Sequence, residues 1–263
     1  MSQDILPGNV TFDPLSDEFT VDPYPTYHRL REQEPVHYSA LSDAWVLTRY
    51  EDVKDGLFHH DALLSQSALD VMGDLRAPAQ AVLKDRVPTL ASLVTADPPA
   101  HTNNRRPIQK ALSARRVRAM QPRIEEIARE LIEKVHLRGS AEFISEFAGP
   151  FPLAVIAELM GVPREDFGRF AEIGEVFKAS HSLEALTLSD EEQVALAHAV
   201  VEADEYLLDL LRQRIRQPQD DFLSEIAQMV RPDGRKFDEG EILSLAHQLA
   251  VAATRRPRAC SAL

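Results

Sequence analysis

The sequence has only one cysteine, Cys260, close to its end. A single cysteine excludes a disulfide framework and a metal cluster held by several cysteines of the chain. Long apolar runs are also missing: the stretch from Leu153 to Met160 contains Glu158 and falls well short of the roughly 20 residues of a membrane span. The start, Met1 to Asp4, has neither the basic nor the apolar segment of a secretory signal. We therefore expect no membrane partner and a cytoplasmic protein.

Basic charge is scarce, with 29 lysines and arginines against 42 acidic residues and a formal net charge of −13. This balance argues against general nucleic-acid affinity, for which clustered basic charge supplies most of the binding energy. The part from Asn103 to Arg123 is an exception, because it contains basic residues and no acidic one. Such a basic run either attracts an acidic partner or forms an ordinary solvated helix surface. Its members are Arg105, Arg106, Lys110, Arg115, Arg116, Arg118 and Arg123.

Helical periodicity dominates the chain, so we expect a mainly α fold with a small β-sheet. Ser-x-x-Glu at 189–192 and Asp-x-x-Glu at 238–241 are capping boxes at the starts of two helices. Segments 61–95 and 179–188 have no sustained period, and we expect irregular connections there. The predicted helices cover residues 23–33, 50–58, 152–160, 163–179, 189–216, 220–229 and 238–253, and a predicted hairpin pairs 36–38 with 44–47.

One further helix is expected after Ser113. Pro122 should open or kink this helix, since proline has no backbone N–H to donate. Apolar residues with helical spacing follow from Ile124 to Val135. We expect this stripe to lie in the core.

The stretch from Asp97 to Arg106 reads as a rigid turn that leads directly into a helix. Pro98 and Pro99 restrict the backbone, and the next residues run without a helix breaker. His101 and Arg105 are four positions apart, so they share one helical face near the helix N-terminus. A planar guanidinium and an imidazole together suit a ligand with two carboxylates. The alternative is an ordinary solvated helix start.

The pattern Asp-Pro-Pro-x-His-Thr-x-x-Arg in this stretch, followed by the basic run, resembles the helix C signature of bacterial cytochromes P450. In that family the histidine and the arginine bind the propionates of the haem cofactor. The resemblance therefore implies that His101 and Arg105 bind haem propionates. Asn103 departs from the family, which usually has a basic residue just after the threonine.

Two N-terminal segments resemble the same family. They are Asp-Pro-Tyr-Pro at 22–25 and Trp-Val-Leu-Thr-Arg-Tyr-Glu-Asp-Val at 45–53. With them, the resemblance covers the chain up to Thr254. It implies a soluble, class I cytochrome P450 fold that is incomplete, with helices A to I only, so that residues 1–254 form the N-terminal part of one domain.

The resemblance also assigns partners and pocket residues. Segment 61–95 would be a lid over the substrate pocket and 179–188 a second lid; a surface loop and an ordinary helical hairpin are the alternatives. An acidic ferredoxin or similar electron carrier would dock near Arg105, Arg106, Lys110, Arg115 and Arg116. A small apolar substrate would contact Leu90, Leu93, Val94, Ala252 and Ala253.

The match to the family stops at Thr254. Ala252-Ala253-Thr254 fits the first half of the family's Ala-Gly/Ala-x-Glu/Asp-Thr-Thr motif, but an unrelated sequence with Pro257 follows. Bases that encode Arg-Arg-Pro-Arg can encode Glu-Thr-Thr in another frame, so we hypothesise a frameshift that makes 255–263 a non-native tail. Beyond Thr254 the family's Glu-x-x-Arg pair and its Cys loop are both missing. We therefore predict no catalytic residue and no metal ligand, and Cys260 is not expected to ligate haem.

The intact protein is expected, by this resemblance, to be a haem-thiolate monooxygenase that hydroxylates a small organic substrate with O2 and ferredoxin-type electrons. The chain as given is expected to be inactive. A non-catalytic helical binding or interaction protein is the alternative. A helical transcriptional regulator is disfavoured by the net charge and by the lack of a recognisable helix-turn-helix.

Overall fold

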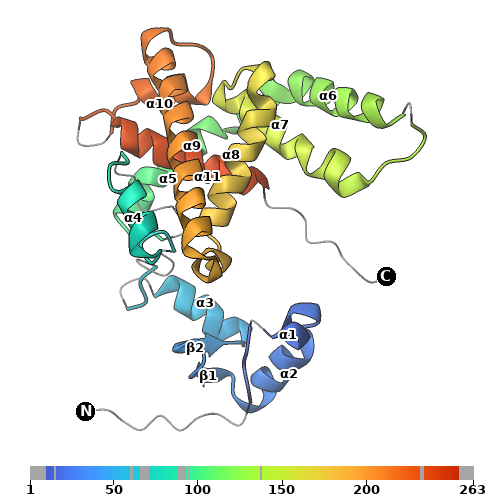
Figure 1. Cartoon of the computed structure of the whole chain (residues 1–263), viewed down its shortest axis with the longest axis vertical. Coiled ribbons are helices and arrows are strands. Elements are labelled where there is room, and N and C mark those ends of the chain that lie inside the picture. Colours follow the sequence, from blue (N-terminus) through green and yellow to red (C-terminus); the bar gives the residue numbers. More distant parts are fainter. Residues whose placement is uncertain are drawn as a thin grey trace. The chain divides into compact units, whose positions relative to one another are not determined.

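The computed structural model of the chain describes residues 10–14, 16–59, 62–65, 71–87, 93, 95–136, 138–231 and 234–254 (Figure 1). These residues are mostly helical and include a two-stranded sheet, which confirms the predicted fold class. The chain divides into two compact units, residues 1–64 and residues 65–263. Among the described residues, no helix has both the length and the apolar character that crossing a bilayer requires.

The first unit contains the predicted hairpin and the helices around it. The hairpin strands are antiparallel, with Val36 opposite Leu47 and Ser39 opposite Ala44. An Asp22 carboxylate oxygen accepts the Tyr24 N–H at 3.1 Å, which fixes the start of the first predicted helix. The elements are α1 (Asp17–Val21), α2 (Tyr24–Gln33), β1 (Val36–Ser39), β2 (Ala44–Leu47) and α3 (Tyr50–Phe58).

The second unit is helical in its described residues apart from an isolated bridge between Val230 and Lys236. Apart from α4, its helices follow the predicted segments closely. They are α4 (Ala77–Leu83), α5 (Ala100–Ala111), α6 (Ala114–His136), α7 (Pro150–Met160), α8 (Phe167–Ser180), α9 (Asp190–Arg216), α10 (Phe222–Gln228) and α11 (Glu239–Thr254), with the short turns η1 (Ile144–Ala148), η2 (Arg164–Asp166) and η3 (Leu183–Thr187).

Both predicted capping boxes are present. The Ser189 hydroxyl accepts the Glu192 N–H at 3.3 Å, and the Glu192 carboxylate accepts the Ser189 N–H at 2.8 Å. The backbone hydrogen bond from Ser189 lowers the pKa of Glu192. Asp238 and Glu241 exchange the same two bonds at 2.8 and 3.0 Å. These local contacts fix where α9 and α11 begin.

The core of the second unit is built around α11, which packs against α7, α8 and α9. Large side chains from these helices are fully buried, including Phe170, Phe177, Leu207 and Leu245. Each such side chain stabilises the fold by about 1.5–3 kcal/mol relative to an exposed position. The apolar face of α11 therefore organises this unit.

Three predictions about single segments were wrong. Segment 61–95 is not wholly irregular, because α4 forms there with Ala79 buried against the rest of the unit. Pro122 does not open a helix, because α6 begins at Ala114 and runs through it; the alternative, a kink at Pro122, stays a prediction. Of the α6 stripe, Ile127 is buried while Ile132 is 51% exposed. The reason is that α6 packs mainly on α7 and η1, and in Figure 1 it lies at the edge of the unit.

Candidate functional site

The predicted turn before α5 is anchored through Asp97. Its carboxylate accepts the Ser65 N–H at 2.9 Å, and its carbonyl accepts the His101 N–H at 2.9 Å. The Pro98–Pro99 peptide bond that follows is cis. Asp97 thus joins the preceding segment to the first turn of α5, and this fixes where the helix begins.

His101 and Arg105 lie one turn apart on α5, as the spacing predicted. His101 is half-buried and Arg105 is exposed, whereas Asn104 and Pro107 are the buried residues of the helix. Within the part of the chain that the structure describes, neither the imidazole nor the guanidinium has a hydrogen-bond or ion-pair partner. Both groups are therefore available to bind carboxylates of a ligand.

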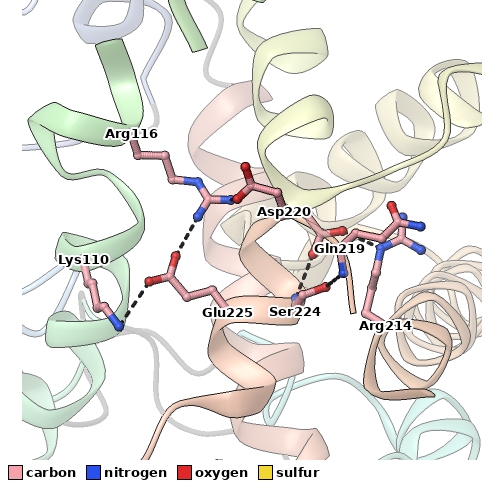
Figure 2. Close-up of polar contacts among 8 residues, drawn as sticks. Lys110, Arg116, Arg214, Gln219, Asp220, Ser224 and Glu225 are labelled. Carbon is pink, nitrogen blue, oxygen red and sulfur yellow. Dashed lines mark hydrogen bonds and ion pairs between the residues drawn. The ribbon is translucent and has the colours of Figure 1, made fainter. Parts of the chain in front are cut away.

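The basic run is only partly free. Figure 2 shows Lys110 of α5 and Arg116 of α6 directed at Glu225 of α10, at 3.3 and 2.7 Å. Arg116 also lies 3.5 Å from Asp220, and its side chain is 19% exposed. These two cations hold α5 and α6 against α10, so their role is structural.

The other cations of the run differ in their contacts. Arg123 is bound by Glu126 and, at 2.9 Å, by Glu158 of α7. A cavity of about 560 Å³ lies between α5, α6, α7 and α10. Most of the cations that line it already have these carboxylate partners. Four exposed cations form no ion pair with any residue in the described ranges: Arg105, Arg106, Arg115 and Arg118.

Sequence reasoning missed a buried charged cluster that ties α9 and α11 to the segment after α4. Arg86 Nε lies 2.6 Å from Asp204 Oδ2, and His247 Nε2 lies 2.7 Å from Asp204 Oδ1, although the second pair is poorly aligned for a hydrogen bond. The His247 ring packs on Phe177 with centroids 3.9 Å apart. The only signal in the sequence is a histidine inside the apolar pattern of α11.

Burial sets the protonation of this cluster. Burial lowers the pKa of His247 and outweighs the opposite effect of Asp204, so the imidazole is neutral at pH 7. Burial alone would raise the pKa of Asp204, but the hydrogen bond and the charge of Arg86 favour the carboxylate, and the pKa is lowered. The cluster is therefore an Arg86–Asp204 ion pair with a neutral histidine beside it.

The predicted pocket residues can be placed only in part. Leu93 is half-buried, and its N–H donates to Gln248 Oε1 of α11 at 2.7 Å. Gln248 Nε2 in turn donates to the Ser244 carbonyl at 3.0 Å. Ala252 is exposed on α11, and Ala253 follows it in the helix. Leu90 and Val94 lie outside the described residues, as do Cys260 and the rest of 255–263.

The chain is similar to bacterial cytochromes P450 over most of its length. It is 32% identical to cytochrome P450 107B1 of Saccharopolyspora erythraea over 259 residues, which are 94% of this chain and 58% of that protein. It is 33% identical over 246 residues to the 6-deoxyerythronolide B hydroxylase of the same organism, with 90% and 58% coverage. The solved structure of the Bacillus subtilis P450 PksS superimposes with a TM-score of 0.73 at 26% identity, covering 93% of this chain and 58% of that one. No protein-family model matches the chain.

The chain belongs to the cytochrome P450 family. It spans about 58% of the length of the curated relatives that it matches. This membership confirms the resemblance drawn from the helix C signature.

The residues on α5 fit one end of the P450 cofactor. An imidazole and a guanidinium one turn apart, both without a partner in the described part of the chain, match two propionate carboxylates. A thiolate ligand for the haem iron would have to come from a cysteine, and the described ranges contain none. They also contain no group of three His, Cys, Asp or Glu residues able to hold a metal ion. The described part of this P450 therefore fits the periphery of a haem and supplies no thiolate ligand.

Gly161, at the end of α7, allows a direct test of how closely this helix end packs against Asp221. Gly161 has φ +84°, and a Cβ there would lie 2.2 Å from Asp221 Oδ2. Gly161→Ala is therefore expected to lower the free energy of unfolding by about 3 kcal/mol, measured by urea denaturation. Gly168→Ala in α8 is the matched control: nothing lies within 4 Å of its Cβ position, and a gain of about 0.5–1 kcal/mol is expected. Equal effects at the two positions would contradict this explanation.

Proposed function

We propose that the chain is the propionate-binding part of a cytoplasmic bacterial P450 monooxygenase that hydroxylates a small apolar substrate with O2. The observation that carries the proposal is the pair His101 and Arg105 on α5, directly after the Asp97 anchor, whose side chains have no partner among the described residues. Relatives that include a hydroxylase support it. When bound, the haem supplies the iron chemistry; His101 and Arg105 bind and orient its carboxylates.

A ferredoxin-type carrier supplies the electrons in this proposal. Its acidic surface would contact the basic run where cations are exposed and unpaired in the described part of the chain, at Arg106, Arg115 and Arg118. Lys110 and Arg116 contribute less to docking, because Glu225 already binds them. Arg105 is left out of this docking surface, because the proposal assigns it to a haem propionate.

The substrate pocket is proposed to border α11. Gln248 holds the backbone of Leu93 against this helix, and Ala252 leaves an exposed small residue farther along it. Both features support an apolar pocket beside α11. Leu90, Val94 and Ala253 complete the proposed lining.

The chain as given is proposed to be inactive, because residues 255–263 replace the oxygen-activating motif after a frameshift. Sequencing the gene across the codons for Thr254 and Arg255 tests this. A shifted frame that encodes Glu-Thr-Thr, Glu-x-x-Arg and a Cys loop is the expected result. If neither shifted frame contains these motifs, the frameshift hypothesis is wrong, and a role as a non-catalytic binding protein becomes the better explanation.

Haem titration tests the proposed site in the chain itself. Haem added to the chain is expected to bind without the absorption signature of a thiolate ligand. His101→Ala and Arg105→Ala should each weaken binding about tenfold or more, because each removes a charge-assisted hydrogen bond. Arg118→Ala is the control, since Arg118 is also an exposed, unpaired cation in the described residues. An equal loss for Arg118→Ala would show non-specific attraction instead of a site on α5.

A further inference from the structure

The two segments that the sequence marked as separate lids pack on each other. Residues 71–87 and the turn η3 are far apart in the sequence, yet they share one small hydrophobic cluster with α9. This cluster is distinct from the main core around α11. Its buried members are Val71, Leu75, Ala79, Ala185 and Ala197.

One buried amide contacts both segments. Gln193, in the first turns of α9, is 1% exposed. Its Oε1 accepts the Arg76 N–H at 2.9 Å, and its Nε2 donates to the Ala185 carbonyl at 3.0 Å. The buried side chain thus satisfies a backbone donor of one segment and a backbone acceptor of the other.

A second link between the segments lies at the surface. Arg76 Nε is 2.8 Å from Asp190 Oδ1, and the Arg76 guanidinium also donates to the Leu188 carbonyl. Both charged side chains are about half exposed, so solvent screens this ion pair. The bonds of Gln193 are costlier to lose, because its amide is buried and the bond to the Ala185 carbonyl is buried as well.

We propose that Gln193 couples residues 71–87 and η3 into one cooperative unit, so that local opening of either segment opens the other. The inference goes beyond the proposed monooxygenase function, because it needs neither haem nor substrate. Where both segments border a substrate pocket, a single opening event controls access from both sides. Gln193 is then a positioning residue and not a catalytic one.

Amide hydrogen exchange of the wild-type chain is the first test. Amides in residues 77–83 and in residues 183–188 are expected to share one opening equilibrium and one dependence on urea. Different urea dependences for the two segments would overturn the proposal. This measurement needs no variant and so does not depend on how a substitution folds.

The variant Gln193→Leu provides the second test. It keeps the volume of the side chain but leaves Arg76 N–H and Ala185 C=O unpaired, so exchange in both segments should rise together by about tenfold or more. The matched control is Gln80→Leu, because the Gln80 amide donates only to the Met72 and Gly73 carbonyls of its own segment. Because opening of one segment opens the other, Gln80→Leu should accelerate both segments when Gln193 is present, and residues 71–87 alone when Gln193→Leu is also introduced. Acceleration of residues 71–87 alone by the single variant Gln80→Leu, or of one segment alone by Gln193→Leu, would refute the coupling.

Discussion

Asp204→Asn is expected to lower the free energy of unfolding by about 3–5 kcal/mol. The Asp204 side chain is 5% exposed, and its carboxylate is the only one within 4 Å of Arg86 in the described residues. Asparagine has nearly the same shape, so the substitution removes the charge and little packing. Arg86, with an 11% exposed side chain, is then left buried without a counterion. Urea denaturation followed by circular dichroism measures the loss.

Asp209→Asn is the matched control on the same helix. The Asp209 side chain is 81% exposed, and its carboxylate lies 3.9 Å from Arg212. An exposed pair of this kind contributes little, so a change within about 0.5 kcal/mol is expected. If Asp204→Asn cost no more than this control, Arg86 would have to find water or another acceptor, and the cluster would not join α9 to the segment after α4.

The sequence predicted most helix starts because their signals are local. Ser189 with Glu192 and Asp238 with Glu241 bond within one turn, so their geometry follows from spacing alone. The α4 helix was missed for the opposite reason. It is short and rich in alanine and proline, and its stability comes from burying Ala79 in the cluster shared with α9.

The candidate site shows the same difference between local contacts, which the sequence predicts, and contacts between distant residues, which it does not. His101 and Arg105 could be placed from the sequence because a helix puts residues four apart on one face. The ion pairs of Lys110 and Arg116 could not, because Glu225 is more than 100 residues away in the sequence. A run of basic residues therefore predicts local positive charge but not which cations remain free, and only the packing of α10 on α5 and α6 decides that.

Arg214→Met is expected to cost about 3–5 kcal/mol in the free energy of unfolding, and about 2 kcal/mol of this loss should be recovered in Arg214→Met/Asp221→Asn. Arg214 Nε bonds Asp221 Oδ2 with both side chains about 5% exposed, and the guanidinium also donates to the Gly161 carbonyl. The single variant leaves a buried carboxylate unpaired, whereas the double variant removes that charge. Asparagine at 221 still accepts the Ser224 N–H that caps α10.

The double variant distinguishes two explanations of how the Arg214–Asp221 pair affects stability. If the lost attraction between the charges were the main cost, the double variant would be about as unstable as Arg214→Met, because that attraction is lost only once. If an uncompensated buried charge is the main cost, the double variant is more stable than Arg214→Met by about 2 kcal/mol. We expect the second result. The Arg214–Asp221 pair also matters for the α5 face, because Asp220 precedes Asp221 in the chain and binds Arg116 together with Glu225 of α10. Loosening α10 would free Lys110 and Arg116 from Glu225, and the unpaired positive charge available to an acidic partner would grow.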